Sequence, residues 1–389
     1  MTQNLPARRG LVLAGGGAKG SYQVGVWRAL MELDWRPQII TGTSVGSLNG
    51  AMFALDLYET ARDMWLSIRS QDVMELPGEE AGLLHEVVRD GGMDVTPLEE
   101  IVDRVLDEPA LRTGPVQLGL VTVEKKGLKP RELTLDEIPE GKLKDYLLAS
   151  AACFPALRAR SIDGIQYLDG GYSDNMPTAL AARMGAEELV CVDLEGVGIT
   201  RPNRTGLPTI LVRSHWDLGD ILRFDPEVAQ RNMALGYFDT LRAFGRIRGC
   251  AYAVDDEGQS AADASRFAAR FAAIQRAVLA EYPVTWTAGA ALRLSKLRDQ
   301  ALAPLEAAAE DMEVDPPRYY TVKTLSAAFL DRCDYGRIRV FFPLLDGQGS
   351  AALAARAAVA PSTFLQAMVY RALTLPPPAP PKITEVTKA

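Results

Sequence analysis

The sequence predicts an α/β protein: a three-layer α/β/α domain built on a mostly parallel central sheet, followed by a helical C-terminal extension. Residues 11–14 form an apolar run that ends at glycines, and residues 21–33 place apolar side chains near helical spacing. Residues 38–41 then form a second apolar run, and an apolar helical segment follows Gly46. Two strand–turn–helix units in succession favour parallel strands with helices on both faces of the sheet.

Further strand signals follow in the first half of the chain. Apolar segments at residues 116–121, 189–192 and 209–212 are interpreted as core strands. Alternating apolar residues between positions 162 and 168 indicate another strand, which ends at Asp169. These strands are separated by helical patterns, which again favours a largely parallel sheet.

The character of the chain changes after about residue 213, where strand signals become sparse. Helical composition is found at residues 226–248, 261–280, 290–303 and 351–373, and the last three of these segments are rich in alanine. A short apolar run at residues 338–342 is interpreted as a strand that returns to the sheet. We therefore expect a mostly helical region packed on the sheet domain.

Composition excludes several classes of protein. The 389 residues contain 42 Lys and Arg against 50 Asp and Glu, a net charge of 42 − 50 = −8, which argues against a general nucleic-acid binder. Two histidines, His85 and His215, cannot by themselves build a three-histidine metal site.

The four cysteines form no Cys-x-x-Cys pair, which favours a reducing compartment over a disulfide framework. No apolar run approaches the ~18 to 20 residues that span a bilayer, so we expect no transmembrane segment.

The first motif with chemical content is the glycine-rich loop at residues 15–20, between a strand and a helix. Backbone N–H groups at a helix N-terminus form a site for negative charge, either a phosphate or a reaction oxyanion. The loop has the G-x-G-x-x-G form of a dinucleotide site, but the second strand ends without the acidic residue that would hold a ribose. A phosphate-binding loop requires Gly-Lys-Ser/Thr, whereas the chain has Lys19-Gly20-Ser21. A merely structural turn is the remaining alternative.

The second motif is Gly42-Thr43-Ser44-Val45-Gly46, which follows a strand and opens a helix. This is the setting of a G-x-S-x-G nucleophile elbow, in which glycines permit the sharp turn and the serine hydroxyl stands at the helix N-terminus. The alternative is a serine that only caps the helix. The glycine-rich loop favours the elbow, because serine hydrolysis needs donors for a tetrahedral oxyanion.

The third motif, Asp169-Gly170-Gly171, follows the last of the predicted strands in the middle of the chain. Taken alone, this pattern is typical of an ordinary turn. At a strand end, however, the Asp169 carboxylate is in a place to face Ser44, and a serine hydroxyl is a poor nucleophile without a base.

Together the three motifs resemble the patatin-like phospholipase family. The order of glycine loop, elbow and acid motif is that of the family, with 169 − 44 = 125 positions between serine and aspartate, and the residues 21–26 after the loop match a continuation common in bacterial members. The resemblance covers roughly residues 8–215. It implies a patatin-like catalytic domain, which we place at residues 8–245, while composition predicts a mostly helical region over 246–375 and a proline-rich, disordered tail over 376–389.

The resemblance also implies a catalytic dyad and assigns the roles of its residues. Ser44 would be the nucleophile that forms an acyl-enzyme, and Asp169 the general base. The oxyanion hole would comprise Gly15, Gly16 and Gly17, with the backbone N–H groups of the last two as donors and Lys19 where members carry a basic residue. No metal or organic cofactor is implied. Gly42 and Gly46 would shape the elbow, and Gly170 and Gly171 the acid motif.

The implied function is that of a serine lipid acyl hydrolase, a phospholipase that cleaves carboxylic esters of lipids at a membrane or micelle surface. The expected location is cytoplasmic, either free or peripheral to a membrane. Secretion without a cleaved signal is left open. Homo-oligomerisation, the choice between hydrolysis and acyl transfer, and head-group preference are also left open.

Two alternatives remain. Ser44, Asp169 and His215 stand in the chain order of an α/β-hydrolase triad, although that fold normally builds several strands before its nucleophile. His85 is expected on an ordinary helix face. The other alternative is a lipid- or partner-binding module whose site is silent.

Overall fold

The structure, a computed structural model, describes residues 7–75, 92–283, 294–295, 297 and 299–375. The chain divides into two compact units, residues 1–246 and residues 247–389. The predicted helical face around His85 and the proline-rich tail lie outside the described residues. The domain limits inferred from the sequence stay a prediction.

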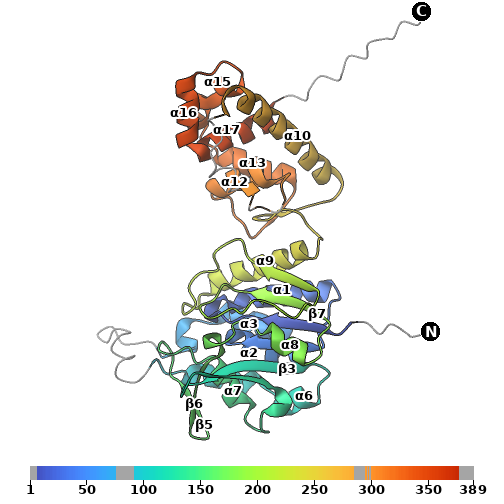
Figure 1. The fold of residues 1–389 in the computed structure, drawn as a ribbon, viewed down its shortest axis with the longest axis vertical. Coiled ribbons are helices and arrows are strands. Elements are labelled where there is room, and N and C mark those ends of the chain that lie inside the picture. The colour runs from blue at the N-terminus through green and yellow to red at the C-terminus, as the bar shows by residue number, and fades with distance from the viewer. Residues whose placement is uncertain (1–6, 76–91, 284–293, 296, 298, 376–389) are drawn as a thin grey trace, which may run out of the picture. The chain divides into compact units, whose positions relative to one another are not determined.

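The first unit is built on one mixed sheet (Figure 1). The strand order is β5-β6-β3-β2-β1-β7-β8, and β4 pairs with the edge of β3 opposite to the one shared by β2 and β6. The pairs β3–β2, β2–β1, β1–β7 and β7–β8 are parallel, whereas β4 and β6 run antiparallel to β3 and β5 runs antiparallel to β6. The strands are β1 (Arg9–Leu13), β2 (Ile39–Thr43), β3 (Gln117–Glu124), β4 (Lys129–Thr134), β5 (Arg160–Ile162), β6 (Ile165–Asp169), β7 (Glu188–Asp193) and β8 (Thr209–Arg213).

Helices cover both faces of this sheet because successive side chains of a strand point to opposite faces. In β1, Leu11 and Leu13 join a core with α1, α2, α3 and α9, whereas Val12 joins a second core with α8 on the other face. The described helices of this unit are α1 (Ser21–Glu32), α2 (Val45–Ala54), α3 (Tyr58–Ser67), α5 (Thr96–Val105), α6 (Glu108–Thr113), α7 (Leu143–Ser150), α8 (Thr178–Arg183) and α9 (Pro226–Ala243). The prediction of a mostly parallel sheet between helical layers is confirmed.

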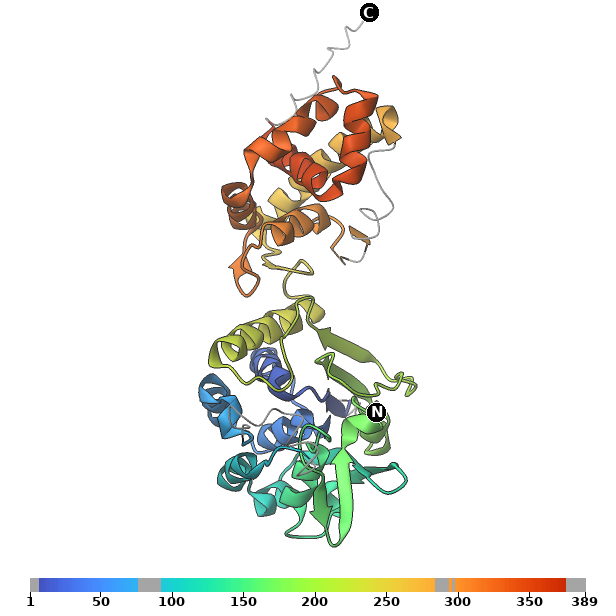
Figure 2. The ribbon, with the colours of Figure 1, turned by 90° about the vertical axis from the view of Figure 1, so that its left-hand side faces the viewer.

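Helices α1 and α9 lie side by side on one face of the sheet (Figure 2). Their close approach depends on glycine, because a Cβ atom at Gly25 would overlap the Met233 carbonyl and one at Gly236 would overlap the Tyr22 carbonyl. The buried Tyr22 hydroxyl donates a hydrogen bond to Asp239 (2.7 Å) across the same interface. Helix α9 is thereby fixed against the first helix of the domain.

The second unit is mostly helical, as predicted. Its helices pack around aromatic side chains such as Phe329, Phe341 and Phe364, which are almost wholly buried. Two very short strands pair in parallel. The described elements are β9 (Ala253–Val254), α10 (Gly258–Glu281), α12 (Ala303–Asp311), β10 (Tyr319–Tyr320), α13 (Val322–Arg332), α14 (Tyr335–Ile338), the 3₁₀ turn η6 (Arg339–Phe341), α15 (Phe342–Leu345), α16 (Ala351–Val359) and α17 (Pro361–Thr374).

The predicted strand at residues 338–342 is wrong. This segment contains the end of α14, a 3₁₀ turn and the start of α15. The Asp334 side chain caps α14 by accepting from the Arg337 N–H (3.1 Å), and Phe341 and Phe342 pack on Phe364 and Tyr370 of α17. A helix N-cap and aromatic packing outweigh the strand preference of an apolar run.

Two helical predictions in the second unit also need revision. Residues 351–373 form two helices, α16 and α17, which are bent by 108° at a break before Pro361. Of the predicted helix at 290–303, residues 290–293, 296 and 298 lie outside the described residues, Leu294 and Ser295 are helical, residues 299–302 are not, and α12 begins at Ala303. Among the described helices none is by itself long and apolar enough to cross a membrane, and only the bent pair α16–α17 passes such a test jointly.

Candidate active site

Ser44 lies on a sharp turn between β2 and α2. Its backbone has φ 56° and ψ −130°, a conformation that non-glycine residues rarely adopt and that is found where a structure holds it in place. The glycines of the motif make the turn possible, because a Cβ at Gly42 would overlap the Gly46 carbonyl and one at Gly46 would overlap the Leu13 carbonyl. The strand–turn–helix context predicted for the elbow is therefore present.

Strand register brings Asp169 to the same edge of the sheet as Ser44. Strand β4 pairs along one edge of β3, so β2 and β6 share the other edge, where the neighbouring residues Val121 and Thr122 of β3 pair with Thr43 and Asp169 respectively. Strands β2 and β6 run toward each other along this edge and end at adjacent positions of β3, so Ser44, which follows Thr43 directly, comes next to Asp169. The sequence could not supply this register, because it depends on β6 running antiparallel to β3.

The Asp169 carboxyl group is buried beside Ser44. Burial raises its pKa from the ordinary 3.8 to about 6, while hydrogen bonds from the Gly171 N–H (2.7 Å) and from the Ser44 side chain lower it in part. Desolvation disfavours the charged carboxylate and so increases its affinity for a proton. A carboxylate with this pKa, in contact with a serine hydroxyl, can accept the serine proton near neutral pH.

The end of helix α7 holds both of these residues by their backbones. The buried Ser150 hydroxyl accepts from the Ser44 N–H (2.9 Å) and donates to the Val121 carbonyl (2.6 Å). Two residues later, the Ala152 carbonyl accepts from the Asp169 N–H (2.9 Å). The sequence analysis missed Ser150, because a single serine in an apolar helix carries no local motif.

The glycine-rich loop lies on the other side of Ser44. The Gly15 N–H donates to the Asn175 carbonyl (3.2 Å), so it is already used. Within the part of the chain that the structure describes, the N–H groups of Gly16 and Gly17 have no hydrogen-bond acceptor, and both residues line the same cavity as Ser44. Gly17 has φ 54° and a Cβ there would overlap the Ile221 carbonyl, so this position requires glycine.

Lys19 is placed differently from the glycines. Its ammonium group donates to the Glu195 carbonyl (3.3 Å), its N–H donates to the Gly16 carbonyl (3.2 Å), and it is not among the residues that line the cavity. Lys19 thus ties the loop to the segment after β7. The glycines of the acid motif are also packed tightly, since a Cβ at Gly170 would overlap the Val121 carbonyl.

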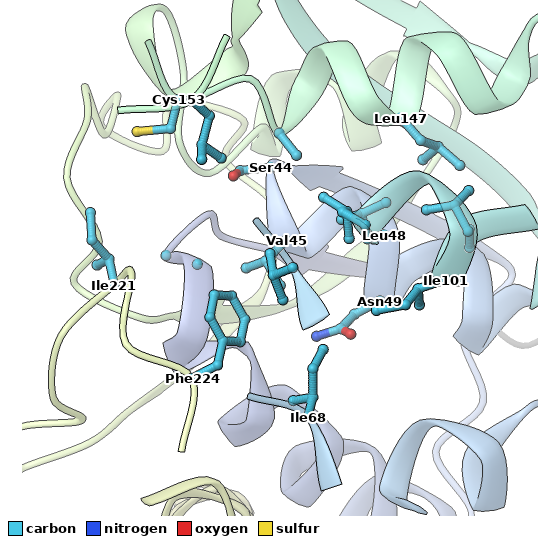
Figure 3. Close-up of a pocket in the computed structure, with 18 of the residues that line it drawn as sticks. Ser44, Val45, Leu48, Asn49, Ile68, Ile101, Leu147, Cys153, Ile221 and Phe224 are labelled. Carbon is cyan, nitrogen blue, oxygen red and sulfur yellow. The ribbon is translucent and has the colours of Figure 1, made fainter. Parts of the chain in front are cut away.

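An apolar cavity opens at Ser44 and continues along one face of α2 (Figure 3). Val45, Leu48, Asn49, Met52 and Leu55 line it at helical spacing. The amide of Asn49 is hydrogen-bonded to Gly20, Gln23 and Trp65, so it leaves no unsatisfied polar group in the wall. The opposite walls come from α3, α5, α7 and later loops and include Met64, Ile68, Leu98, Ile101, Val102, Val105, Leu147, Leu157, Ile221, Leu222 and Phe224.

The structure places His215 and Cys153 in different surroundings. His215 stacks edge-on against Trp216 and influences the pKa of Asp239 electrostatically, and it is not among the residues that line the cavity at Ser44. Cys153 does line the cavity, and burial together with the nearby Asp169 raises the pKa of its thiol to about 11. The thiol is therefore protonated at neutral pH and is a weak nucleophile.

A serine on a strand-to-helix turn, a buried carboxylate and two unused glycine amides thus meet at one apolar cavity of an α/β domain, as in serine-dependent hydrolases. Residues 11–182 match the family model described as patatin-like phospholipase. Over this part of the chain, the resemblance to the family that the sequence motifs predicted is confirmed.

Curated relatives agree with this assignment. Patatin-like phospholipase domain-containing protein 7 of Rattus norvegicus is 27% identical over 187 residues, which cover 47% of this chain and 13% of that protein. Lysophospholipase nte1 of Aspergillus oryzae is 27% identical over 263 residues, covering 62% and 16%. The chain thus spans only about 13 to 16% of the length of these two relatives.

Two solved structures are distant neighbours of the chain. VipD from Legionella pneumophila has a TM-score of 0.39 and 14% identity, covering 95% of this chain and 94% of that one. The type III effector protein ExoU has a TM-score of 0.36 and 15% identity, covering 92% and 78%. Similarity at this level does not bear on function.

Proposed function

We propose that this protein is a serine lipid acyl hydrolase that cleaves carboxylic esters of lipids through Ser44 and Asp169. The observation that carries the proposal is the meeting of the Ser44 hydroxyl, the buried Asp169 carboxyl and the unused Gly16 and Gly17 amides at the mouth of one apolar cavity. Named relatives that include lysophospholipases support the same class of reaction.

The first half of the reaction follows from this geometry. The Ser44 Oγ attacks the ester carbonyl carbon while its proton passes to the Asp169 carboxylate. The carbonyl oxygen becomes an oxyanion, which the N–H groups of Gly16 and Gly17 stabilise. When the tetrahedral intermediate collapses, the bond to the leaving alcohol breaks, and the alcohol takes the proton from Asp169. The acyl group remains on Ser44 as an ester.

The second half releases the acid. A water molecule gives its proton to Asp169 and attacks the acyl carbon, and the new intermediate collapses to a free fatty acid. The proton returns from Asp169 to the Ser44 oxygen, so that both residues end in their starting states. No histidine is needed in this cycle, because the raised pKa of Asp169 suits it to hold the proton between the two steps.

The cavity favours a substrate with an apolar chain. The face of α2 that lines the cavity extends from Val45 to Leu55. This is ten residues along the helix axis, or about 15 Å. A fully extended hydrocarbon chain advances by roughly 1.25 Å per carbon, so this wall has the length of about twelve carbons. An acyl chain bound there would bury its methylene groups against aliphatic side chains, which is the favourable contribution to binding.

Hydrolysis of short-chain p-nitrophenyl esters and of phospholipid vesicles by wild type, Ser44→Ala and Asp169→Asn tests the proposal. We expect both variants to lose at least about a hundredfold in kcat, since each removes a group that acts in the transition state. Ser67→Ala and Asp163→Asn, at exposed positions of α3 and of the β5–β6 turn, are matched controls expected to keep activity.

Other outcomes would favour the alternatives. Absence of serine-dependent turnover with every lipid tested would indicate a binding module. Transfer of the acyl group to an added alcohol, seen by product analysis, would identify a transacylase that uses the same acyl-enzyme.

A further inference from the structure

Two exposed apolar side chains stand at the mouth of the cavity. Val197 is 78% exposed and also lines the cavity that contains Ser44. Ile199, two residues further on, is 55% exposed. Single exposed apolar residues are common on protein surfaces, but a group of them at the entrance of an apolar cavity indicates contact with an apolar partner.

The backbone fixes these side chains in their outward positions. The Ile199 N–H donates to the Gly171 carbonyl (2.8 Å), and its own carbonyl accepts from the Asn175 N–H (2.7 Å). Gly196 packs so closely on Gly15 that a Cβ would overlap the Gly15 carbonyl. The segment therefore bridges the glycine loop and the acid motif, and its exposed side chains are held at the surface by a rigid support.

A basic turn adjoins this entrance. The turn between β3 and β4 has the sequence Lys125-Lys126-Gly127-Leu128-Lys129, with three lysines and no acidic residue, and Leu128 is 59% exposed. The Lys125 ammonium lies over the Phe154 ring (4.2 Å to its centroid), and the Tyr172 hydroxyl donates to the Phe154 carbonyl.

Tyr172 connects the basic turn to the entrance, because it follows directly after Gly171, which holds Ile199. Arg201, which is half exposed, donates to the Ser173 backbone carbonyl (3.0 Å) and hydroxyl (3.0 Å), and its charge is partly balanced by the Glu132 carboxylate (3.9 Å). This set of residues is called here the rim patch: Lys125, Lys126, Leu128, Lys129, Tyr172, Val197, Ile199 and Arg201.

The charge of the rim patch contrasts with that of the whole chain, which is −8. Lysines at a surface are attracted to anionic lipid head groups, and neighbouring apolar side chains can enter the boundary between head groups and acyl chains. The patch combines both features and opens directly into the cavity. The positive charge alone would also suit a second copy of this acidic protein, and it is the apolar cavity lined by Val197 that favours a lipid surface, because a lipid chain can enter it.

We infer that the rim patch docks the protein on an anionic lipid surface, with the lysines of the β3–β4 turn on the head groups and Leu128 and Ile199 at their boundary with the acyl chains. A lipid chain would then pass from the bilayer along Val197 into the cavity without crossing water. The inference extends the proposed function by naming the surface that meets the lipid, but docking itself does not require turnover.

Vesicle co-sedimentation of the full-length Ser44→Ala protein measures docking without hydrolysis. We expect binding to vesicles of phosphatidylcholine with phosphatidylserine to exceed binding to phosphatidylcholine alone, and to fall as salt is added. The double variant Lys126→Gln/Lys129→Gln should weaken binding by about thirtyfold, because two attractions, each worth a factor of about five to six, are removed. Lys142→Gln/Lys144→Gln, at the start of α7 and so at its far end from Ser150, is the matched control.

The apolar part is tested separately with Leu128→Ser/Ile199→Ser. This variant should bind anionic vesicles more weakly, whereas Val359→Ser should not, although Val359 is 81% exposed in the second unit. In the background with intact Ser44, all four variants should hydrolyse a soluble short-chain ester at the wild-type rate, which excludes misfolding.

Equal vesicle binding by the rim variants and their parent would overturn the inference, as would equal binding to neutral and anionic vesicles. A change of oligomeric state in the rim variants without a change in vesicle binding would assign the patch to a second copy and would also overturn it. Wild type that binds as expected but has no esterase activity would contradict the proposed function and leave the docking surface standing.

Discussion

Replacing Asp169 with asparagine should separate activity from stability. The pKa of Asp169 is raised from 3.8 to about 6, so the folded state binds this proton more tightly than the unfolded chain does. The stability that this group contributes is fully present below its unfolded pKa and is lost as pH rises through about 6. At pH 8 the loss amounts to about 3 kcal/mol, because each tenfold change in proton affinity is worth about 1.4 kcal/mol.

The substitution Asp169→Asn removes the cost of burying a charged carboxylate but keeps the hydrogen bonds of the side chain. Its side-chain oxygen can still accept from the Gly171 N–H, and its amide can donate to the Ser44 oxygen. Relative to wild type, the free energy of unfolding of the variant should therefore increase by about 2.4 kcal/mol between pH 4 and pH 8. The variant should at the same time be inactive, because an amide cannot accept the serine proton.

Urea unfolding at a series of pH values measures this difference. Tryptophan fluorescence reports mainly on the first unit, which contains Trp27, Trp35, Trp65 and Trp216 of the five tryptophans. Asp163→Asn, in the exposed turn between β5 and β6, should instead give a curve parallel to that of wild type. Parallel curves for Asp169→Asn and wild type would refute the reasoning, because they would mean that burial does not perturb this carboxyl group.

Further predictions concern the base, the histidine, the α7 contact and the elbow. The kcat/KM of wild type for a soluble ester should fall as pH drops below about 6, and a profile flat to pH 5 would argue against Asp169 as the base. His215→Ala should keep near-normal esterase activity; a loss as deep as that of Ser44→Ala would instead support the triad. Ser150→Ala should lower the free energy of unfolding by about 1 to 3 kcal/mol and reduce kcat more than it changes KM, since it leaves the buried Ser44 N–H without its acceptor. Unchanged values in chemical denaturation and kinetics would show that the contact is dispensable. Gly46→Ala should lower the melting temperature markedly, because the new Cβ would overlap the Leu13 carbonyl; a melting temperature equal to that of wild type would contradict this packing.

Local patterns in the sequence predicted the first unit well. The runs at residues 11–14 and 38–41 correspond to β1 and β2, and Gly17, Gly42 and Gly46 of the motifs after them occupy positions where a Cβ would overlap neighbouring backbone. The glycines that form the sequence motifs are therefore also the residues at which the fold leaves no room for a side chain. The alternating segment at residues 162–168 was less informative, because it contains the turn at Asp163 and Gly164 and forms the two paired strands β5 and β6.

Interactions between distant residues account for what the sequence could not predict. Ser150 lies 106 positions from Ser44, and only the packing of α7 on β3 brings its hydroxyl to the elbow. The apolar run at residues 338–342 has the composition of a strand, but in the fold its aromatic side chains pack against α17. Composition records what a segment prefers in isolation, whereas these outcomes depend on its partners.

The contacts of the glycine-rich loop bear on how small a working enzyme of this type could be. Strand β1, which leads into the loop, pairs on one side with β7, and the Ile221 carbonyl accepts from the Ala18 N–H (2.8 Å). Both partners lie beyond residue 182, where the match to the family model ends. A fragment cut at that limit would keep Ser44 and Asp169 but leave a central strand with an open edge and the oxyanion loop without its anchor. The minimal catalytic fragment therefore has to extend at least through Ile221. The segment that the family model matches is thus shorter than the segment that the catalytic site needs.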